Sequence, residues 1–271
     1  MSLDAVYEVY AVRYAHYAPR KARENFLMAA GQGKDDHEGA MPFDYFVWAV
    51  VGGGRTIVVD TGFDAPTAAR RGRALLLPPR DGLLALGIDP ASVTDVVLTH
   101  LHYDHAGNHD LFPQATYWIQ DREIAYATGR HMCHQVLRLG YEAEDACAVV
   151  RKIFAGRVRC VDGEAELCPG ISLHHLGGHT RGMQCVRVRT RRGWVVLASD
   201  ATHFYANLET DNPFPALWHV GEALAGFATL RRLATSQAHI IPGHDPQVMA
   251  RYPSAKPGLE GRIVRLDAEA R

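Results

Sequence analysis

The stretch that decides the fold is VVLTHLHYDHAGN, residues 96–108. Its apolar, β-branched start predicts a buried strand, and His100, His102, Asp104 and His105 follow directly after it. Imidazole and carboxylate groups are the usual protein ligands of Zn²⁺. A strand end can hold such ligands rigidly, because the sheet fixes the backbone from which they project. The stretch therefore predicts a metal site at the edge of a sheet.

Three further segments repeat this arrangement. Each is an apolar run that predicts a strand and is followed by a histidine or aspartate, usually beside glycine. The runs are residues 171–176, 194–198 and 239–241. The side chains that follow them are His179, Asp200 and His244. Because α/β enzymes gather their chemistry on loops at strand ends, we expect the four segments to converge on one site.

Together the four segments offer seven donors, more than a single tetrahedral zinc ion takes. This number suits a pair of divalent ions that share one carboxylate and a bridging water. We expect Asp200 to be the shared carboxylate. The other donors divide into a first set and a second set, which are His100, His102 and His179, and Asp104, His105 and His244.

Asp60 also follows an apolar strand, in Val58-Val59-Asp60-Thr61-Gly62. We expect its carboxylate to accept a hydrogen bond from the outer N–H of a ligand histidine and so to fix the tautomer of that ring. An aspartate that caps the following turn explains the same residue equally well. The sequence leaves both interpretations open.

The bulk properties fit a folded α/β protein and argue against some partners. The chain has 271 residues, of which 47% are hydrophobic and 22% charged, so a sizeable core can form. The formal net charge of -1 gives no support for nucleic acid or an anionic membrane as partner. The absence of a signal-like start or a long apolar run, together with five scattered cysteines, favours a cytoplasmic protein.

No linker or repeat divides the chain, so we expect one domain over residues 1–271. Residues 17–47 begin with a polar stretch of little periodicity and are predicted to form a lip over the active site. Further strands are expected at residues 5–13 and in a hairpin of residues 43–51 and 56–60. Helices are expected at residues 64–77, 121–127, 142–154 and 221–235.

Taken together, these motifs resemble those of the metallo-β-lactamase superfamily. The matching elements are VVDTG, THLHYDHAGN, GGHT, SDA and PGHD, in the family's order, and they extend from Asp60 to His244. The resemblance implies an α/β fold, an αβ/βα sandwich of two mixed β-sheets flanked by helices, with two Zn²⁺ at one edge. Within the superfamily the chain looks most like the N-acyl-homoserine-lactone lactonases. The features that carry this resemblance are the motif HLHYDHAGN, the SDA motif followed by NLE, and the last of the motifs, PGHD. This resemblance implies that the protein opens a lactone ring.

The resemblance also suggests catalytic roles and shows one departure. Asp104 would carry a proton to the leaving alkoxide. The lactonases commonly have a tyrosine three residues after the bridging aspartate, where it contacts the substrate carbonyl, but this chain has His203 there and Tyr205 two residues further on. Either side chain could supply that hydrogen bond. The β-lactamases that use zinc typically carry cysteine at the position of Asp200, which argues against β-lactam hydrolysis.

Other activities on the same fold stay open. A thioester hydrolase of the glyoxalase II type would need basic residues for the glutathione carboxylates. A phosphodiesterase would need a basic face, which the balanced charge does not offer. A di-iron oxidoreductase fits less well, because its motif carries glutamate where His102 stands.

The expected partner is a small-molecule lactone or ester. Several aromatic residues are candidates for an apolar wall around it, although aromatics are more often part of a core. These residues are Phe43, Tyr45, Phe46, Trp48, Phe204, Phe214 and Trp218. Exposed aromatics within residues 204–218 would favour a homodimer.

Overall fold

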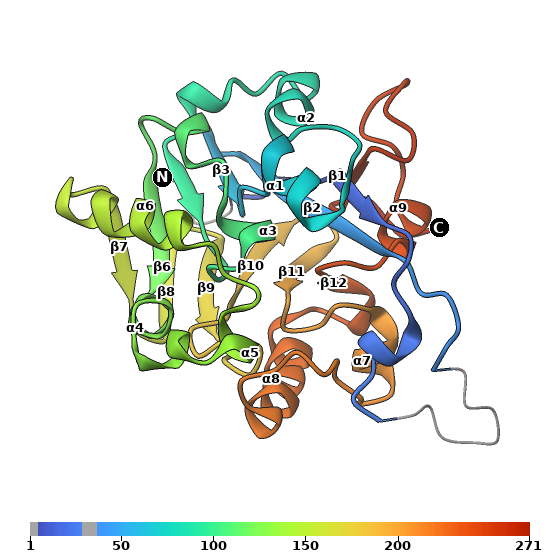
Figure 1. The fold of residues 1–271 in the computed structure, drawn as a ribbon. Coiled ribbons are helices and arrows are strands. Elements are labelled where there is room, and N and C mark those ends of the chain that lie inside the picture. The colour runs from blue at the N-terminus through green and yellow to red at the C-terminus, as the bar shows by residue number, and fades with distance from the viewer. Residues whose placement is uncertain (1–4, 29–36) are drawn as a thin grey trace.

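The computed structural model describes residues 5–28 and 37–271, and its centre is formed by two β-sheets packed face to face (Figure 1). The larger sheet contains, in spatial order, β13 (Ile263–Arg265), β1 (Glu8–Tyr17), β2 (Phe43–Gly52), β3 (Arg55–Val59), β5 (Asp95–Val97), β6 (Thr116–Gln120) and β7 (Val158–Val161), with β4 (Ala74–Leu75) paired to β1. The second sheet contains β12 (Ile240–Pro242), β11 (Gly193–Ser199), β10 (Gln184–Thr190), β9 (Ile171–His175) and β8 (Glu164–Cys168).

Both sheets mix strand directions. In the larger sheet β3, β5, β6 and β7 run parallel to one another, whereas β1, β2 and β3 are antiparallel neighbours. In the second sheet β11 and β12 are parallel and the other pairs are antiparallel. Helices lie outside the sheets (Figure 1). This arrangement confirms the predicted αβ/βα sandwich.

The core explains why the strands of the larger sheet are apolar on both faces. Trp48 of β2 is fully buried between the two sheets, where it belongs to one apolar cluster with Leu197 of β11. Its neighbour Ala49 points the other way and is buried with Val58 and Leu83 under the outer helices. Because both faces are covered, alternation between apolar and polar residues is lost in this strand.

The helices are α1 (Ala65–Arg71), α2 (Pro79–Ala85), α3 (Tyr103–Ala106), α4 (Asp121–Ala127), α5 (Gln135–Arg138), α6 (Ala143–Phe154), α7 (Tyr205–Glu209), α8 (Val220–Leu233) and α9 (Gln247–Arg251). Short 3-10 turns occupy Ala22–Glu24, Pro90–Ser92, His109–Leu111, Arg130–Cys133 and Gln237–His239. No helix in the described part of the chain has the length and apolar character needed to cross a membrane.

Most predicted elements are found, and one predicted helix is too long. The helix expected over 64–77 ends at Arg71, because Gly72 adopts a φ of 64° and closes the helix in a left-handed cap. The short strand β4 follows it. The other three expected helices correspond to α4, α6 and α8 within two residues at each end.

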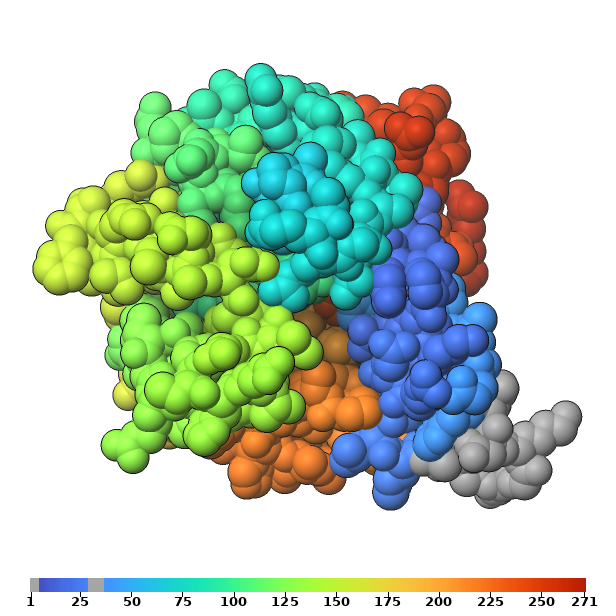
Figure 2. Space-filling model, in the orientation of Figure 1, coloured from blue at the N-terminus to red at the C-terminus, as the bar shows by residue number. Residues whose placement is uncertain are grey.

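The predicted lip, residues 17–47, is partly regular structure. Tyr17 ends β1, Ala22–Glu24 form a 3-10 turn, and β2 begins at Phe43. Residues 29–36 of this segment lie outside the described residues. The molecular surface is hollowed where the N-terminal segment, the region of α1 and the region of α5 meet (Figure 2).

Candidate metal centre

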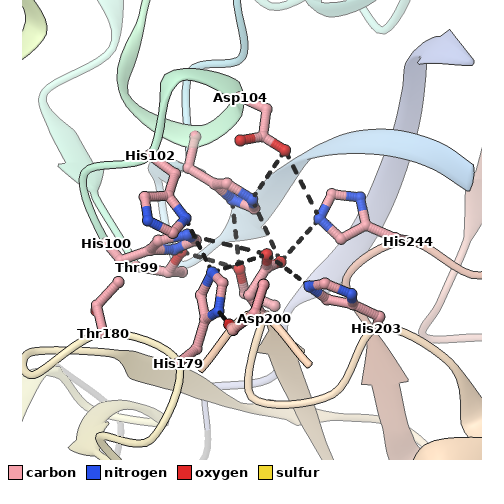
Figure 3. Close-up of polar contacts among 12 residues, drawn as sticks. Thr99, His100, His102, Asp104, His179, Thr180, Asp200, His203 and His244 are labelled. Atoms are coloured by element: carbon pink, nitrogen blue, oxygen red, sulfur yellow. Dashed lines mark hydrogen bonds and ion pairs between the residues drawn. The ribbon is translucent and has the colours of Figure 1, made fainter. Parts of the chain in front are cut away.

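The predicted metal ligands meet where strands of the two sheets end (Figure 3). His100 and His102 lie on the loop after β5, and Asp104 and His105 lie in α3. The remaining ligands follow the strands of the second sheet. They are His179 after β9, Asp200 after β11 and His244 after β12. The structure therefore brings together all four segments that the sequence singled out.

Asp200 lies between the two predicted sets of donors. Its Oδ2 atom is 3.4 Å from Nε2 of His179 and 3.9 Å from Nε2 of His100. Its Oδ1 atom is 2.8 Å from Nε2 of His244 and 3.3 Å from Nε2 of His105. Each carboxylate oxygen thus faces one set, which is the geometry expected of a bridging ligand.

The two remaining donors complete these sets. Nδ1 of His102 is 2.9 Å from Nε2 of His179, on the Oδ2 side of the shared carboxylate. Oδ2 of Asp104 is 3.6 Å from Nε2 of His105 and 3.8 Å from Nε2 of His244. Within each set the ligand atoms lie within 4.8 Å of one another. The arrangement provides two adjacent sites for a cation.

The unpaired atoms at the centre show that these residues fit metal ions. Nε2 of His100, His105 and His244 and Oδ1 of Asp200 are buried and have no hydrogen-bond partner among the described residues. Buried polar atoms are rarely left unpaired, because each one loses the hydrogen bonds that water would give it. Here lone pairs from different strands face a common space, which two divalent cations would satisfy.

Electrostatics at the two sites differ. Burial and the neighbouring imidazoles hold the pKa of His100 and of His102 well below the ordinary value, so both rings are neutral and able to bind a metal. Burial also lowers the pKa of His105, but the carboxylates of Asp200, Asp104 and Asp60 outweigh it and raise the pKa well above the ordinary value. The three carboxylates therefore favour positive charge at the second site.

Acceptors behind the ligand histidines fix which ring nitrogen faces the centre. Nδ1 of His244 donates to the carbonyl of Asp44 at 2.7 Å, and Nδ1 of His179 donates to the carbonyl of Ala216 at 2.6 Å. A carbonyl can only accept, so Nδ1 carries the proton and the Nε2 lone pair points inward in both rings.

Asp60 holds a third ligand in the same way. Its Oδ2 atom lies 2.7 Å from Nδ1 of His105, and the carboxylate also accepts from the amide and hydroxyl of Thr99, each at 2.8 Å. Asp60 has a φ of 60°, a left-handed conformation that non-glycine residues seldom adopt. The predicted role behind a ligand histidine is confirmed, and the alternative of a local capping aspartate is not.

Glu123 in α4 was not predicted, although it organises the centre. Its buried carboxylate accepts from the amide of Leu101 at 2.9 Å, between two ligand histidines, and from the hydroxyl of Tyr141 at 2.9 Å. It also accepts from Thr180 Oγ1 at 2.6 Å and from the amide of Gly182 at 3.1 Å. In sequence it resembles any acidic residue in the first turn of a helix, so no local signal marks it.

The centre opens into a cavity of about 270 Å³. His102, Asp104, His179 and Asp200 form its floor, and His203 lies beside them. Aromatic side chains and three arginines form its walls. These lining residues are Phe43, Tyr45, Tyr103, Tyr126, Trp218, Arg20, Arg71 and Arg73. The shape and contents suit a compact organic ligand next to the metal sites.

His203 is the predicted substrate contact that the structure brings to the cavity. Its Nε2 atom is 3.0 Å from Oδ2 of Asp200, and its ring stacks on Phe214 with centroids 3.3 Å apart and planes at 4°. Its Nδ1 atom is buried, with no hydrogen-bond partner within residues 5–28 and 37–271. The ring is therefore held firmly by packing against Phe214 and by Asp200.

Tyr205 requires a correction. The helix α7 begins at this residue, and the turn into the helix directs the ring between the sheets, where it packs in the core with Ile241 and Tyr252. The guanidinium of Arg251 lies 3.8 Å from the ring centroid. Tyr205 does not line the cavity, so of the two candidates only His203 can contact a substrate there.

The expected aromatic wall is only partly correct. Phe43, Tyr45 and Trp218 line the cavity, whereas Phe46 and Trp48 lie in the core between the sheets. Phe204 and Phe214 are also buried. The aromatics expected to be exposed within residues 204–218 are thus largely covered, and this removes the reason given for a homodimer.

The fold consists of two β-sheets packed face to face. At their edge the Asp200 carboxylate lies between two sets of donors, and together these form a candidate dinuclear metal centre. A model of the Metallo-beta-lactamase superfamily matches residues 40–257, and the chain belongs to this superfamily.

Similar curated proteins are N-acyl homoserine lactonases. One from Bacillus sp. is 28% identical over 165 residues, which is 60% of this chain and 60% of the relative. One from Azorhizobium caulinodans is 31% identical over 181 residues, which is 64% of each chain. The matched region thus spans about 60% of the length of these curated relatives.

Solved structures share the fold over a larger part of the chain. A quorum-quenching N-acyl homoserine lactone lactonase aligns with a TM-score of 0.69 at 22% identity, covering 89% of this chain and 92% of that one. An N-acyl homoserine lactone hydrolase with N-hexanoyl-L-homoserine bound at its catalytic metal centre aligns with a TM-score of 0.70 at 21% identity, covering 89% and 94%. At this level of identity the likeness supports the fold.

Proposed function

We propose that this protein is a dinuclear metal-dependent hydrolase that opens the ring of a small lactone. The observation that carries the proposal is Asp200, which lines a cavity and whose two oxygens face two separate sets of donors, all buried except the partly exposed His102. The curated relatives are N-acyl homoserine lactonases, and one structural neighbour holds the opened product at its metal centre, which supports a lactone as substrate.

The first set, His100, His102 and His179, and the second set, Asp104, His105 and His244, would hold two Zn²⁺ with Asp200 between them. When bound, the ions would supply Lewis-acid chemistry, which activates water at neutral pH and stabilises negative charge on oxygen. Other divalent ions have similar ligand preferences, so the metal identity rests on measurement.

His203 and Asp104 are the protein groups proposed to act on the substrate. His203 lines the cavity beside Asp200, and its Nε2–H, which lies 3.0 Å from Oδ2 of Asp200, is the group proposed to donate to the carbonyl oxygen as negative charge develops there. Asp104 also lines the cavity, and its carboxylate can carry a proton to the alkoxide that leaves when the ring opens. The aromatic walls exclude water and orient the ester.

The test is a pH-drop assay of purified protein whose metal content has been measured. We expect hydrolysis of N-acyl homoserine lactones or other lactones, and much weaker turnover of a glutathione thioester and a phosphodiester. A preference for the thioester would instead assign the protein to hydrolases of the glyoxalase II type. Turnover of an N-acyl homoserine lactone would add quorum quenching to the proposed roles.

A further inference from the structure

Three arginines line the cavity, and their charges are not equally balanced. Arg71 is neutralised, because its Nη2 atom lies 2.8 Å from Oε1 of Glu142 and its Nε atom donates to the same oxygen at 2.9 Å. Arg71 also donates to the carbonyl of Leu139. This arginine is therefore a structural tie between α1 and the segment before α6.

Within the described part of the chain, the hydrogen bonds of Arg73 go to neutral groups. Its Nε atom donates to the hydroxyl of Tyr103 at 3.2 Å, and its Nη1 atom donates to the carbonyl of Arg71 at 2.8 Å. Its guanidinium lies 3.9 Å from the centroid of the Tyr17 ring. Among the residues that the structure describes, none places a carboxylate within 4.0 Å of this half-buried cation.

The hydrogen bonds of Arg20 also go to neutral groups. Its Nε atom donates to Oδ1 of Asn25, its Nη2 atom donates to the carbonyl of Glu24 at 2.9 Å, and its guanidinium lies 4.1 Å from the centroid of Phe43. Within residues 5–28 and 37–271 it too has no carboxylate within ion-pair distance. Burial lowers the pKa of Arg20, which reflects the cost of keeping this charge away from water.

Both cations lie next to the metal centre. Phe43, which contacts Arg20, also stacks on the ligand His244, with ring centroids 3.8 Å apart and planes at 17°. Tyr103, which accepts from Arg73, precedes the ligand Asp104 in α3. The acidic groups nearby are Glu24, Asp104 and Asp200. Glu24 Oε2 accepts from the amide of Lys21, and the carboxylates of Asp104 and Asp200 are directed at the candidate ligand histidines.

Arginine is well suited to bind a carboxylate, because its planar fork gives charge-assisted hydrogen bonds. A neutral ligand would leave both half-buried cations without a close ion-pair partner among the described residues, which is unfavourable. We propose that the substrate is a compact lactone that carries a carboxylate, with Arg20 and Arg73 binding that carboxylate and the metal centre acting on the lactone. This inference rests on the proposed lactonase function and defines its substrate class.

The test uses matched pairs of bicyclic aromatic lactones. Phthalides that carry a carboxylate at each ring position are compared with the corresponding carboxamides, which have nearly the same size and no charge. We expect kcat/KM to be higher by about tenfold or more for at least one carboxylate than for its amide, as expected for one charge-assisted hydrogen bond. The difference should shrink at high ionic strength.

Two substitutions test the residues themselves. R20Q and R73Q should each lower kcat/KM for the preferred carboxylate about tenfold, mainly through KM, and lower kcat/KM for the amide by a smaller factor, so that the ratio between the two substrates falls. R73K should restore part of the preference because it keeps the charge. R80Q is the matched control, since Arg80 is exposed and outside the cavity. Metal content and circular dichroism establish that each variant is folded and loaded.

The outcomes separate the two proposals. Equal kcat/KM for the carboxylates and amides, or a preference that survives R20Q and R73Q, overturns the inference and leaves the lactonase function intact. Failure to hydrolyse any lactone by the metal-loaded protein overturns the proposed function and the inference with it.

Discussion

The Glu123 carboxylate accepts a hydrogen bond from the backbone amide of Leu101 at 2.9 Å, and Leu101 lies between the ligands His100 and His102. The other oxygen of Glu123 accepts from Thr180 and Gly182, on the loop that carries His179. One buried side chain in α4 therefore holds two ligand loops that come from different sheets.

Replacing this carboxylate should loosen the metal centre. E123Q places an amide NH2 against a backbone N–H, either that of Leu101 or that of Gly182, so at least one of these hydrogen bonds is lost and the ligand loop attached by it is loosened. We expect metal affinity to fall about tenfold or more, as is typical when a group behind the ligands is removed. The measurement is metal retained after dialysis against a graded series of chelator concentrations.

Y141F is the comparison for that experiment. It removes one donor from Glu123 and leaves the two ligand loops attached, so metal retention should stay close to that of the unaltered protein. Unchanged retention in E123Q would show that Glu123 serves the fold alone.

Loss of a metal ligand should abolish metal binding and activity together. H102A removes a donor from the first set, and D200A removes the carboxylate between the sets. For both variants we expect less bound metal by elemental analysis and a fall in kcat/KM of about a hundredfold or more, since the first set and the bridging carboxylate hold the ions that activate water. Full turnover by metal-free H102A would refute the dinuclear scheme.

Substitution of His203 should separate substrate contact from metal binding. H203F keeps an aromatic ring against Phe214 and removes both ring nitrogens, so metal content should be unchanged and kcat should fall by about a hundredfold. H203Y restores a donor and should recover part of that loss. Since His203 also lies within reach of His179 and Asp200, a loss of metal in H203F would reassign it as a ligand.

Asp145 in α6 should make stability depend on pH. Burial, followed by the charges of Glu142 and Asp64, raises the pKa of Asp145 from 3.8 to about 7. The folded state therefore holds this proton more tightly than the unfolded state does, and the contribution to stability is present below about pH 4 and lost as pH rises to about 7.

D145N keeps the shape of the side chain and cannot ionise. Above pH 7 we expect it to raise Tm by a few degrees, on the order of 2–4 °C, and to match the unaltered protein near pH 4. Thermal unfolding at several pH values measures this difference. A Tm difference that does not vary with pH would contradict the assignment.

The metal centre could be predicted because each ligand is marked locally by the end of an apolar strand. Glu123 and Arg73 carry no such mark. Glu123 looks like a solvated first-turn acid, and Arg73 falls inside a segment predicted as helix that in fact ends at Arg71. Their roles depend on contacts with distant parts of the chain, which periodicity and motif spacing do not encode.

His203 and Tyr205 illustrate the same limit at short range. They are two residues apart in the sequence, and both could in principle reach a substrate. The start of α7 at Tyr205 decides between them, because it turns one ring into the core and leaves the other beside Asp200. The boundary of a short helix is set by the surrounding packing, which the sequence alone does not reveal.

The metal ligands and the unpaired arginines lie on different stretches of the chain. Arg20 precedes β2 and Arg73 follows α1, and the described residues of these stretches contribute none of the candidate ligands. Mutations there can alter which molecules are accepted while the ligand loops stay intact. On the proposed function, the fold would separate chemistry from selectivity, so that natural variation could diversify substrate choice without first rebuilding the reactive centre.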